Sequence, residues 1–158
     1  MFNLCLQYRH GKGGEQSNEK AFEYCQRAAD EGSKEAINEI GDMYERGDGV
    51  EQSYEKALEY YLRAADMGSA IAHSGLGNLY ENGTGVEQSY EKALEHYQIA
   101  ADQNEKYGLA RMGKMYENGY GVEQSLEKAL EYYRLAADQG FQEAIDALNR
   151  LEKDGKTK

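Results

Sequence analysis

The sequence predicts an all-α fold, a solenoid of paired helices that repeat every 36 residues. Four tyrosines stand at this constant interval: Tyr8, Tyr44, Tyr80 and Tyr116. The block at 49–59 returns unchanged at 85–95 and, with one substitution, at 121–131. A fixed period of this length is typical of arrays in which each unit buries its apolar face only against its neighbours.

No stretch of the chain has the composition of a linker, so we expect one domain over residues 1–158. The units are expected at approximately 1–32, 33–68, 69–104 and 105–140, followed by a capping helix at 141–153. In this last helix Asn149 and Glu152 replace the glycine and the tyrosine of the earlier units. A polar end of this kind keeps an array soluble.

The second helix of each unit is clearest between Ser53 and Asp66. Its apolar residues recur at spacings of three and four, on one helical face: Ala57, Leu58, Tyr61, Ala64 and Ala65. Ser53 is a suitable N-cap because its hydroxyl can accept a hydrogen bond from a free amide of the first turn. The same signal recurs at Ser17, Ser89 and Ser125. Gly68 can end the helix in the left-handed conformation, and its counterparts are Gly32, Gly140 and Asn104.

The first helix of each unit carries its own apolar stripe, formed in one unit by Ala72, Leu76, Gly77, Leu79 and Tyr80. Ser69 precedes this stripe as a plausible N-cap. Its glycine recurs as Gly41 and Gly113. A glycine inside a helix costs roughly 1 kcal/mol relative to alanine, so we expect a close contact with the paired helix to compensate. The small residues expected opposite are Ala57, Ala93 and Ala129.

Two glycines that flank one free position join the helices of a unit, as in residues 82–86. They predict backbone with positive φ, followed by a valine that packs into the core. In the first copy Gly14 stands where the valine is expected, so this turn should be looser. Tyr54 and Tyr90, which begin second helices, could be exposed, but packing over the preceding turn is favoured.

The chain carries 18 basic and 29 acidic residues, a net charge of −11. This sign repels phosphate backbones, so nucleic acid is not an expected partner. No apolar run approaches the roughly 20 residues that cross a bilayer, and the first residues lack a basic leader. The sequence therefore favours a soluble, cytoplasmic protein. An array that begins within a unit is also compatible with a fragment of a longer chain, for which a missing leader carries no information.

Cys5 and Cys25 are too few for a disulfide framework and lack the C-x-x-C spacing of zinc or redox sites. Buried reduced thiols are favoured. A single bridge between the two cysteines stays open for an oxidising compartment.

No nucleophile beside a base, and no set of convergent carboxylates, indicates catalysis, so we expect neither a catalytic residue nor a cofactor. His10, His73 and His96 occupy three different places in the unit. His96 replaces a tyrosine on a helix stripe and is expected to pack there. The acidic loop at 47–49 lacks the alternating oxygen ligands of a calcium loop, so no metal site is expected.

The pattern A-x-x-x-L-G-x-x-Y-x-x-G-x-G-V, complete at 72–86, continues through Lys92, Ala93, Tyr97, Ala100 and Ala101. It resembles the Sel-1-like repeat, a relative of the tetratricopeptide repeat with a longer loop between its helices. The resemblance covers essentially the whole chain. It implies antiparallel helix pairs coiled into a right-handed superhelix that acts as an adaptor or scaffold. Some secreted bacterial members carry a cysteine pair in every unit, and the later units of this chain have none, which disfavours that subgroup.

By resemblance to tetratricopeptide arrays, the helix that ends in the L-G-x-x-Y pattern lines the concave face and meets the partner. The predicted partner-binding residues are Glu35, Asn38 and Asp42 in one unit, Ile71, Ser74 and Asn78 in the next, and Tyr107, Ala110 and Lys114 in the third. Each helix ends with a constant glutamate: Glu45, Glu81 and Glu117. Most of the other positions differ between units, as a groove that reads an irregular ligand requires. Drift of exposed residues would also produce such variation.

Ile71 and Tyr107, one unit apart, are the expected anchors of the partner. The surrounding carboxylates, with Lys114 as the only counter-charge, favour a basic or amphipathic peptide. The expected function is a non-catalytic scaffold for a protein or peptide, as a monomer or a weak end-to-end dimer. Two alternatives stay open. One is a solenoid that is associated with an enzyme or binds a small ligand such as a cell-wall fragment. The other is a purely structural or designed consensus array.

Overall fold

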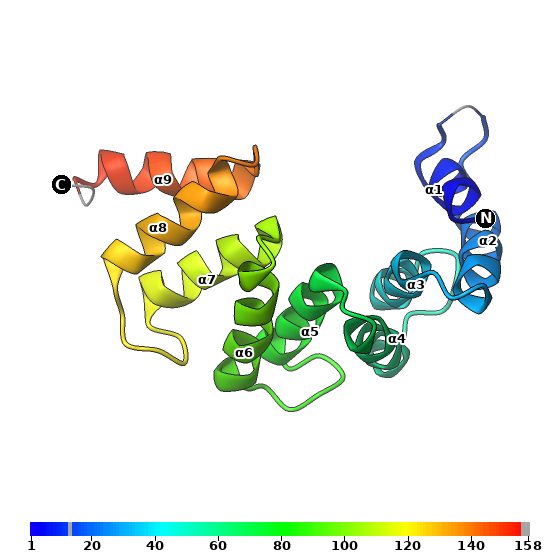
Figure 1. Cartoon of the computed structure of the whole chain (residues 1–158), viewed down its shortest axis with the longest axis horizontal. Helices are drawn as coiled ribbons and strands as arrows, with labels where there is room; N and C mark the ends of the chain where they lie inside the picture. Colours follow the sequence, from blue (N-terminus) through cyan, green and yellow to red (C-terminus); the bar gives the residue numbers. More distant parts are fainter. Residues whose placement is uncertain (13, 156–158) are drawn as a thin grey trace.

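The computed structural model describes residues 1–12 and 14–155, over which the chain forms nine α-helices and no strand (Figure 1). In chain order they are α1 (Phe2–His10), α2 (Asn18–Asp30), α3 (Lys34–Arg46), α4 (Tyr54–Asp66), α5 (Ala70–Asn82), α6 (Tyr90–Asp102), α7 (Lys106–Asn118), α8 (Leu126–Ala137) and α9 (Gln142–Lys153). The predicted all-α solenoid is confirmed. Within this described part, no helix combines the length and the apolar character needed to span a membrane.

The helices follow one another around a curved array whose two ends stand apart (Figure 1). Besides the contacts between consecutive helices, α1 contacts α3, α3 contacts α5, and α5 contacts α7. Helices on the inner side of a curve approach their counterparts in the next unit most closely. The concave face is therefore formed by the odd-numbered helices, and its centre by α3, α5 and α7, which end in the L-G-x-x-Y pattern or its equivalent.

The helix ends follow from the local sequence as predicted. The hydroxyl of Ser53 accepts a hydrogen bond from the backbone N–H of Lys56 at 3.2 Å, which caps α4. Ser69 caps α5 in the same way, through the backbone N–H of Ala72 at 3.2 Å. After α6 the chain turns at Asn104 with a φ of 58°, where other units use a glycine. Asparagine is among the residues that tolerate this left-handed conformation best.

The glycine inside each of α3, α5 and α7 lies against an aromatic ring of the following helix. An ideal Cβ at Gly41 would lie 2.7 Å from the ring of Tyr61, and one at Gly113 would lie 2.7 Å from the ring of Tyr133. The predicted close contact is confirmed, but its predicted partner is wrong. The nearest atoms belong to tyrosine and not to the alanine, such as Ala57, one helical turn earlier. Tyrosine can approach this closely because glycine has no side chain.

The loop glycines have the predicted positive φ, 67° at Gly83 and 70° at Gly85. Gly85 also packs on the preceding unit, because an ideal Cβ there would lie 2.8 Å from Cβ of Tyr54. Tyr54 is therefore packed and not free, but against the loop of the following unit. Val86 and Val122 pack against the core, as predicted.

Cys5 of α1 and Cys25 of α2 form a disulfide bond, with their Cα atoms 5.1 Å apart. Both side chains are fully buried. The expectation of two reduced thiols is therefore wrong, and the bridge that was left open is present. In the chain-entropy view, closing a loop of this length stabilises the fold by roughly 3 kcal/mol. The bond fastens the first helix of the array to the second.

Candidate functional site

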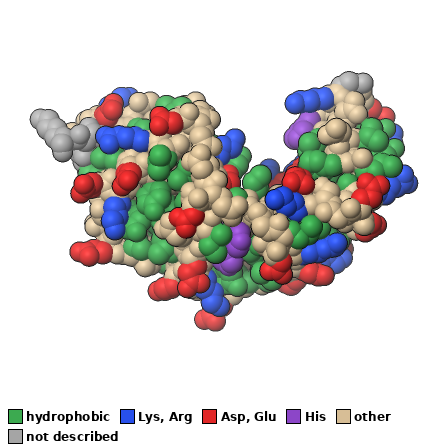
Figure 2. Space-filling view, viewed as in Figure 1, with side chains coloured by type: hydrophobic (Ala, Val, Ile, Leu, Met, Phe, Trp, Pro, Cys, Tyr) green, Lys and Arg blue, Asp and Glu red, His purple; other side chains and the backbone are tan. Residues whose placement is uncertain are grey.

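A groove of about 370 Å³ crosses the concave face between α3, α5 and α7. The space-filling view shows the molecule hollowed between its two ends (Figure 2). Six of the nine predicted partner-binding residues line this groove: Asn38, Asp42, Ile71, Ser74, Asn78 and Tyr107. They come from three units, and the curvature of the array brings them together.

Sequence reasoning missed several residues of the groove wall: Glu39, Tyr61, Gly75, Arg46 and Arg111. A helical signal was available for all of them except Tyr61. Each of the other four follows a predicted residue by four positions, as Arg111 follows Tyr107, and residues four apart share a helix face. Tyr61 was placed correctly on its helix stripe, but the sequence did not show that its ring reaches the concave side.

The other three predicted residues lie elsewhere. Glu35 is exposed in the first turn of α3, where the hydroxyl of Ser33 donates to its carboxylate at 3.2 Å. Ala110 is 3% exposed and belongs to the core, so it offers no surface to a partner. Lys114 lies further along the concave face, in a second groove between α7 and α9.

Ile71 and Tyr107 give the central groove its apolar surface, with 55% and 45% of each residue exposed. The ring of Tyr107 packs edge-to-face on Phe141, with the ring centroids 4.8 Å apart. The ammonium group of Lys106 lies 5.4 Å from the centroid of the same ring. A side chain that is already held in place loses little conformational entropy when a partner covers it.

Asn38 is a buried polar residue in the groove wall. It is 9% exposed, and its Oδ1 has no hydrogen-bond partner among the described residues. The equivalent residue of the next unit, Ser74, does have one, because its hydroxyl donates to the carboxylate of Glu105 at 2.5 Å. An unsatisfied buried acceptor costs about 1–3 kcal/mol.

The constant glutamates hold the tyrosines of the paired helices. Each accepts a hydrogen bond at 2.7–2.8 Å from a tyrosine hydroxyl 16 residues later: Tyr61 to Glu45, Tyr97 to Glu81 and Tyr133 to Glu117. Burial raises the pKa of all three tyrosines, and the carboxylates raise it further, so the hydroxyls remain protonated donors. The constancy of the glutamates therefore has a structural reason.

A second contact joins each unit to the next along the concave face. It links residues 33 positions apart: Arg9 with Asp42, Glu45 with Asn78, Glu81 with Lys114, and Glu117 with Arg150. We call these four contacts rungs. At Glu81, burial alone would raise the pKa of the carboxyl, but the hydrogen bonds from Lys114 and Tyr97 outweigh it and lower that pKa. Three predicted partner-binding residues, Asp42, Asn78 and Lys114, thus also hold the scaffold.

The concave face holds more positive charge than the sequence suggested. Lys114 is not the only counter-charge on this face, because two arginines, Arg46 and Arg111, line the central groove. Arg46 pairs with Asp42 at 2.9 Å, and Arg111 pairs with Glu143 at 3.1 Å. Several carboxylates of this face are therefore already neutralised within the chain.

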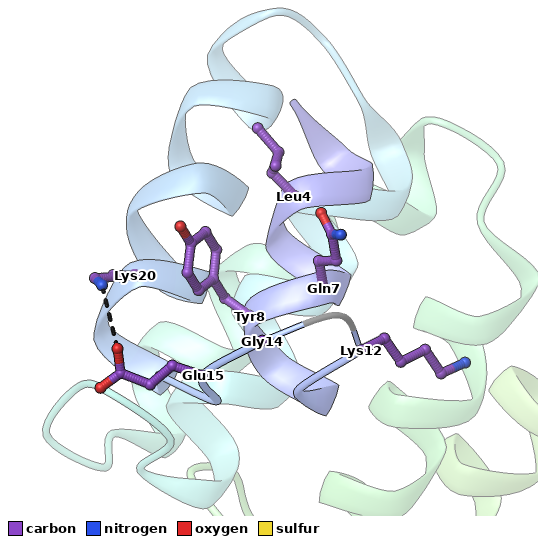
Figure 3. Close-up of a pocket in the computed structure, with 7 residues that line it drawn as sticks. All are labelled: Leu4, Gln7, Tyr8, Lys12, Gly14, Glu15 and Lys20. Carbon is purple, nitrogen blue, oxygen red and sulfur yellow. Dashed lines mark ion pairs between the residues drawn. The ribbon is translucent and has the colours of Figure 1, made fainter.

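A smaller pocket of about 230 Å³ lies at the first unit, beside α1 (Figure 3). Its lining includes Tyr8, Gly14 and Lys20, and Lys20 pairs with Glu15 at 3.8 Å. An ideal Cβ at Gly14 would meet no atom within 4 Å. The pocket lies at the position that a valine takes in the later units. The turn expected to be looser includes residue 13, which lies outside the described residues, so that expectation stays a prediction.

His73 of α5 and His96 of α6 lie against each other, with their Nδ1 atoms 3.0 Å apart. His96 also stacks on Tyr80, with ring centroids 5.6 Å apart, which confirms its packing role. The equivalent pair in the next unit is Leu109 and Tyr132. One proton between the two nitrogens makes a hydrogen bond, whereas protonation of both imidazoles would place two positive charges in contact.

The sequence matches the Sel1 repeat family in four consecutive segments, at residues 1–33, 34–69, 70–105 and 106–141. A search of curated proteins finds no significant match.

Several solved structures share the fold. A protective antigen of uropathogenic Escherichia coli strains, which displays an SLR fold, has 30% identity and a TM-score of 0.83 over 98% of this chain and 33% of its own. A Sel1 repeat protein from Oxalobacter formigenes has 29% identity and a TM-score of 0.83 over 94% of this chain and 61% of its own. Cysteine rich protein B of Helicobacter pylori, at 23% identity, shares the fold with a TM-score of 0.62 over 82% of this chain and 96% of its own.

The chain thus spans 33% and 61% of the length of the first two proteins. The four matched segments cover nearly all of its own length, and its helices stack as they do in these structures. The chain therefore belongs to the Sel1 repeat family.

Proposed function

We propose that this chain is a scaffold that docks a segment of a partner protein in the central groove of its concave face. Sel1 repeat proteins generally serve as non-catalytic scaffolds for protein interactions. The observation that carries the proposal is the half-exposed pair Ile71 and Tyr107 in a groove formed by three units. Large apolar side chains in a concave setting are the usual anchors of an interface.

A basic or amphipathic segment fits this groove best. Its apolar side chains would cover Ile71 and Tyr107, and covering the exposed half of each would stabilise the complex by about 1 kcal/mol per residue. The net charge of −11 attracts a basic segment over a long range and speeds association.

The test uses peptides selected from a random dodecapeptide library for binding to this chain. We expect Ile71→Ala and Tyr107→Ala each to weaken the binding of a selected peptide by about tenfold, because each removes a contact worth roughly 1–1.5 kcal/mol. Isothermal titration calorimetry measures the affinities, and thermal melts check that the variants fold.

Leu135→Ala is the matched control, because Leu135 is 43% exposed but lies on α8, away from the groove lining. It should leave the affinity unchanged. If both groove variants bind selected peptides as tightly as the unmodified chain does, docking in this groove is wrong.

A further inference from the structure

The four rungs of the concave face differ in charge. In three of them a carboxylate meets a cation: Arg9 with Asp42, Glu81 with Lys114, and Glu117 with Arg150. In the remaining rung the carboxylate of Glu45 meets the neutral amide of Asn78 at 3.0 Å. This rung lies in the central groove, since both of its residues line it.

The partners of Glu45 satisfy hydrogen bonds without supplying a positive charge. Its Oε2 accepts from the hydroxyl of Tyr61 at 2.7 Å, and its Oε1 accepts from Nδ2 of Asn78. Each carboxylate oxygen has two lone pairs, so each can accept one further bond. A cationic donor adds a Coulomb attraction to the carboxylate that neither of these two uncharged donors supplies.

The amide of Asn78 is held in the orientation that this arrangement needs. Its Oδ1 accepts a hydrogen bond from Nδ2 of Asn82 at 3.0 Å, so its Nδ2 points to Glu45. Asparagine is shorter than the lysine of the next rung and ends in an uncharged group. The chain itself shows the charged alternative, because Nζ of Lys114 lies 2.5 Å from Oε1 of Glu81.

The arginines of the groove do not take over this role. Arg46 is next to Glu45 in sequence, but its guanidinium pairs with Asp42 at 2.9 Å. Arg111 pairs with Glu143 of α9 at 3.1 Å. The carboxylate of Glu45 therefore remains the place in the groove where an added cation gains most.

We infer that Glu45 receives the ammonium or guanidinium group of a lysine or arginine in the partner segment, beside the Asn78 amide. This inference rests on the proposed docking in the same groove and names the chemistry that the groove selects. The partner's basic side chain completes the second rung, while apolar neighbours in the segment cover Ile71 and Tyr107. Asn78 is then a specificity-determining residue, because it leaves the rung open.

The test gives Glu45 a cationic partner within the chain itself. Asn78→Lys copies the Glu81–Lys114 rung of the next unit, so the variant should fold, which a thermal melt checks. We expect it to bind the selected dodecapeptides about tenfold more weakly, because its own ammonium occupies Glu45. Gln103→Lys, which adds the same charge at an exposed position outside the groove lining, is the control and should change the affinity less than about twofold.

A second test removes the positive charge from the peptide instead of adding one to the protein. Replacing its lysine by norleucine, or its arginine by citrulline, should weaken binding to the unmodified chain by a similar factor. The same replacement should cost little in Asn78→Lys, since the two changes remove one contact. Equal affinities of Asn78→Lys and the unmodified chain, or selected peptides without a basic residue, would contradict the inference.

The outcomes separate this inference from the proposed function. If Ile71→Ala and Tyr107→Ala weaken binding but Asn78→Lys does not, docking in the groove stands and cation recognition at Glu45 fails. If the library yields no peptide that depends on the groove, the proposed function fails and this inference fails with it.

Discussion

Replacing Gly77 by alanine is expected to destabilise the protein by about 2–3 kcal/mol, although alanine is the better helix former. A Cβ at Gly77 would overlap the ring of Tyr97, more closely than at the equivalent glycines of the other units. The ring cannot move aside cheaply. Tyr97 is fully buried, and its hydroxyl donates to Glu81 at 2.7 Å. Chemical denaturation monitored by circular dichroism measures the change in the free energy of unfolding.

A double-mutant cycle identifies the cause of that loss. If the ring of Tyr97 is the obstacle, Gly77→Ala should cost much less in a Tyr97→Leu background, where the ring is absent. Gly14→Ala is the control, because a Cβ there meets no atom within 4 Å. It should be neutral or slightly stabilising. Equal costs of Gly77→Ala with and without the tyrosine ring would show that the contact does not explain the glycine.

Acidification is expected to weaken the fold through the histidine pair in the third unit. Burial lowers the pKa of His73, against the opposing effect of Asp66. Burial and His73 lower the pKa of His96, against the effect of Glu95. Both pKa values therefore lie below the ordinary value of 6.5. As the pH falls through that value, the unfolded chain takes up protons more readily than the folded chain, so stability is lost.

The partial exposure of both rings screens the charges, so we expect a loss of about 1–2 kcal/mol for the pair between about pH 7.5 and pH 5. In a protein of this size this corresponds to roughly 2–8 °C in Tm. The matched control is His73→Leu/His96→Tyr, which copies the Leu109–Tyr132 pair of the next unit and keeps His10. Scanning calorimetry at the two pH values should show a smaller fall in Tm for the variant. An equal fall in both proteins would place the pH sensitivity elsewhere.

Most of the fold could be predicted because the same helix caps and helix contacts recur in several units of the chain. Ser53 and Ser69 were recognised as caps from one unit, and each recurrence removed an alternative explanation. The internal glycine was assigned a close contact for the same reason. Its partner was misjudged, because spacing places Ala57 and Tyr61 on one stripe without showing which of them reaches Gly41.

The site was harder to predict, because comparing units cannot separate variation that serves a partner from variation matched within the chain. Asp42 differs from Asn78 and Lys114, yet it faces Arg9, which stands where the later units have a glutamate. The sign of one position thus follows the sign of another that lies 33 residues away. Only the stacked structure brings the two together, since neither shares a helix face with the other.

Features that occur in only one unit could not be predicted by comparing the units with one another. Cys5 and Cys25 occur only at the start of the array, so no second copy indicated that they meet. The buried acceptor of Asn38 could not be predicted in this way either, because its counterparts Ser74 and Ala110 differ from it in hydrogen-bonding capacity. Both features depend on how neighbouring helices approach one another.

The most direct test of groove docking is to map a selected peptide on the isotope-labelled chain by the NMR shifts of its backbone and side-chain amides. We predict the largest changes on α3, α5 and α7, including the side-chain amides of Asn38 and Asn78. Changes concentrated on α4, α6 and α8 instead, with the two asparagine amides unmoved, would show that the partner binds the outer face and would contradict the concave groove as the docking site.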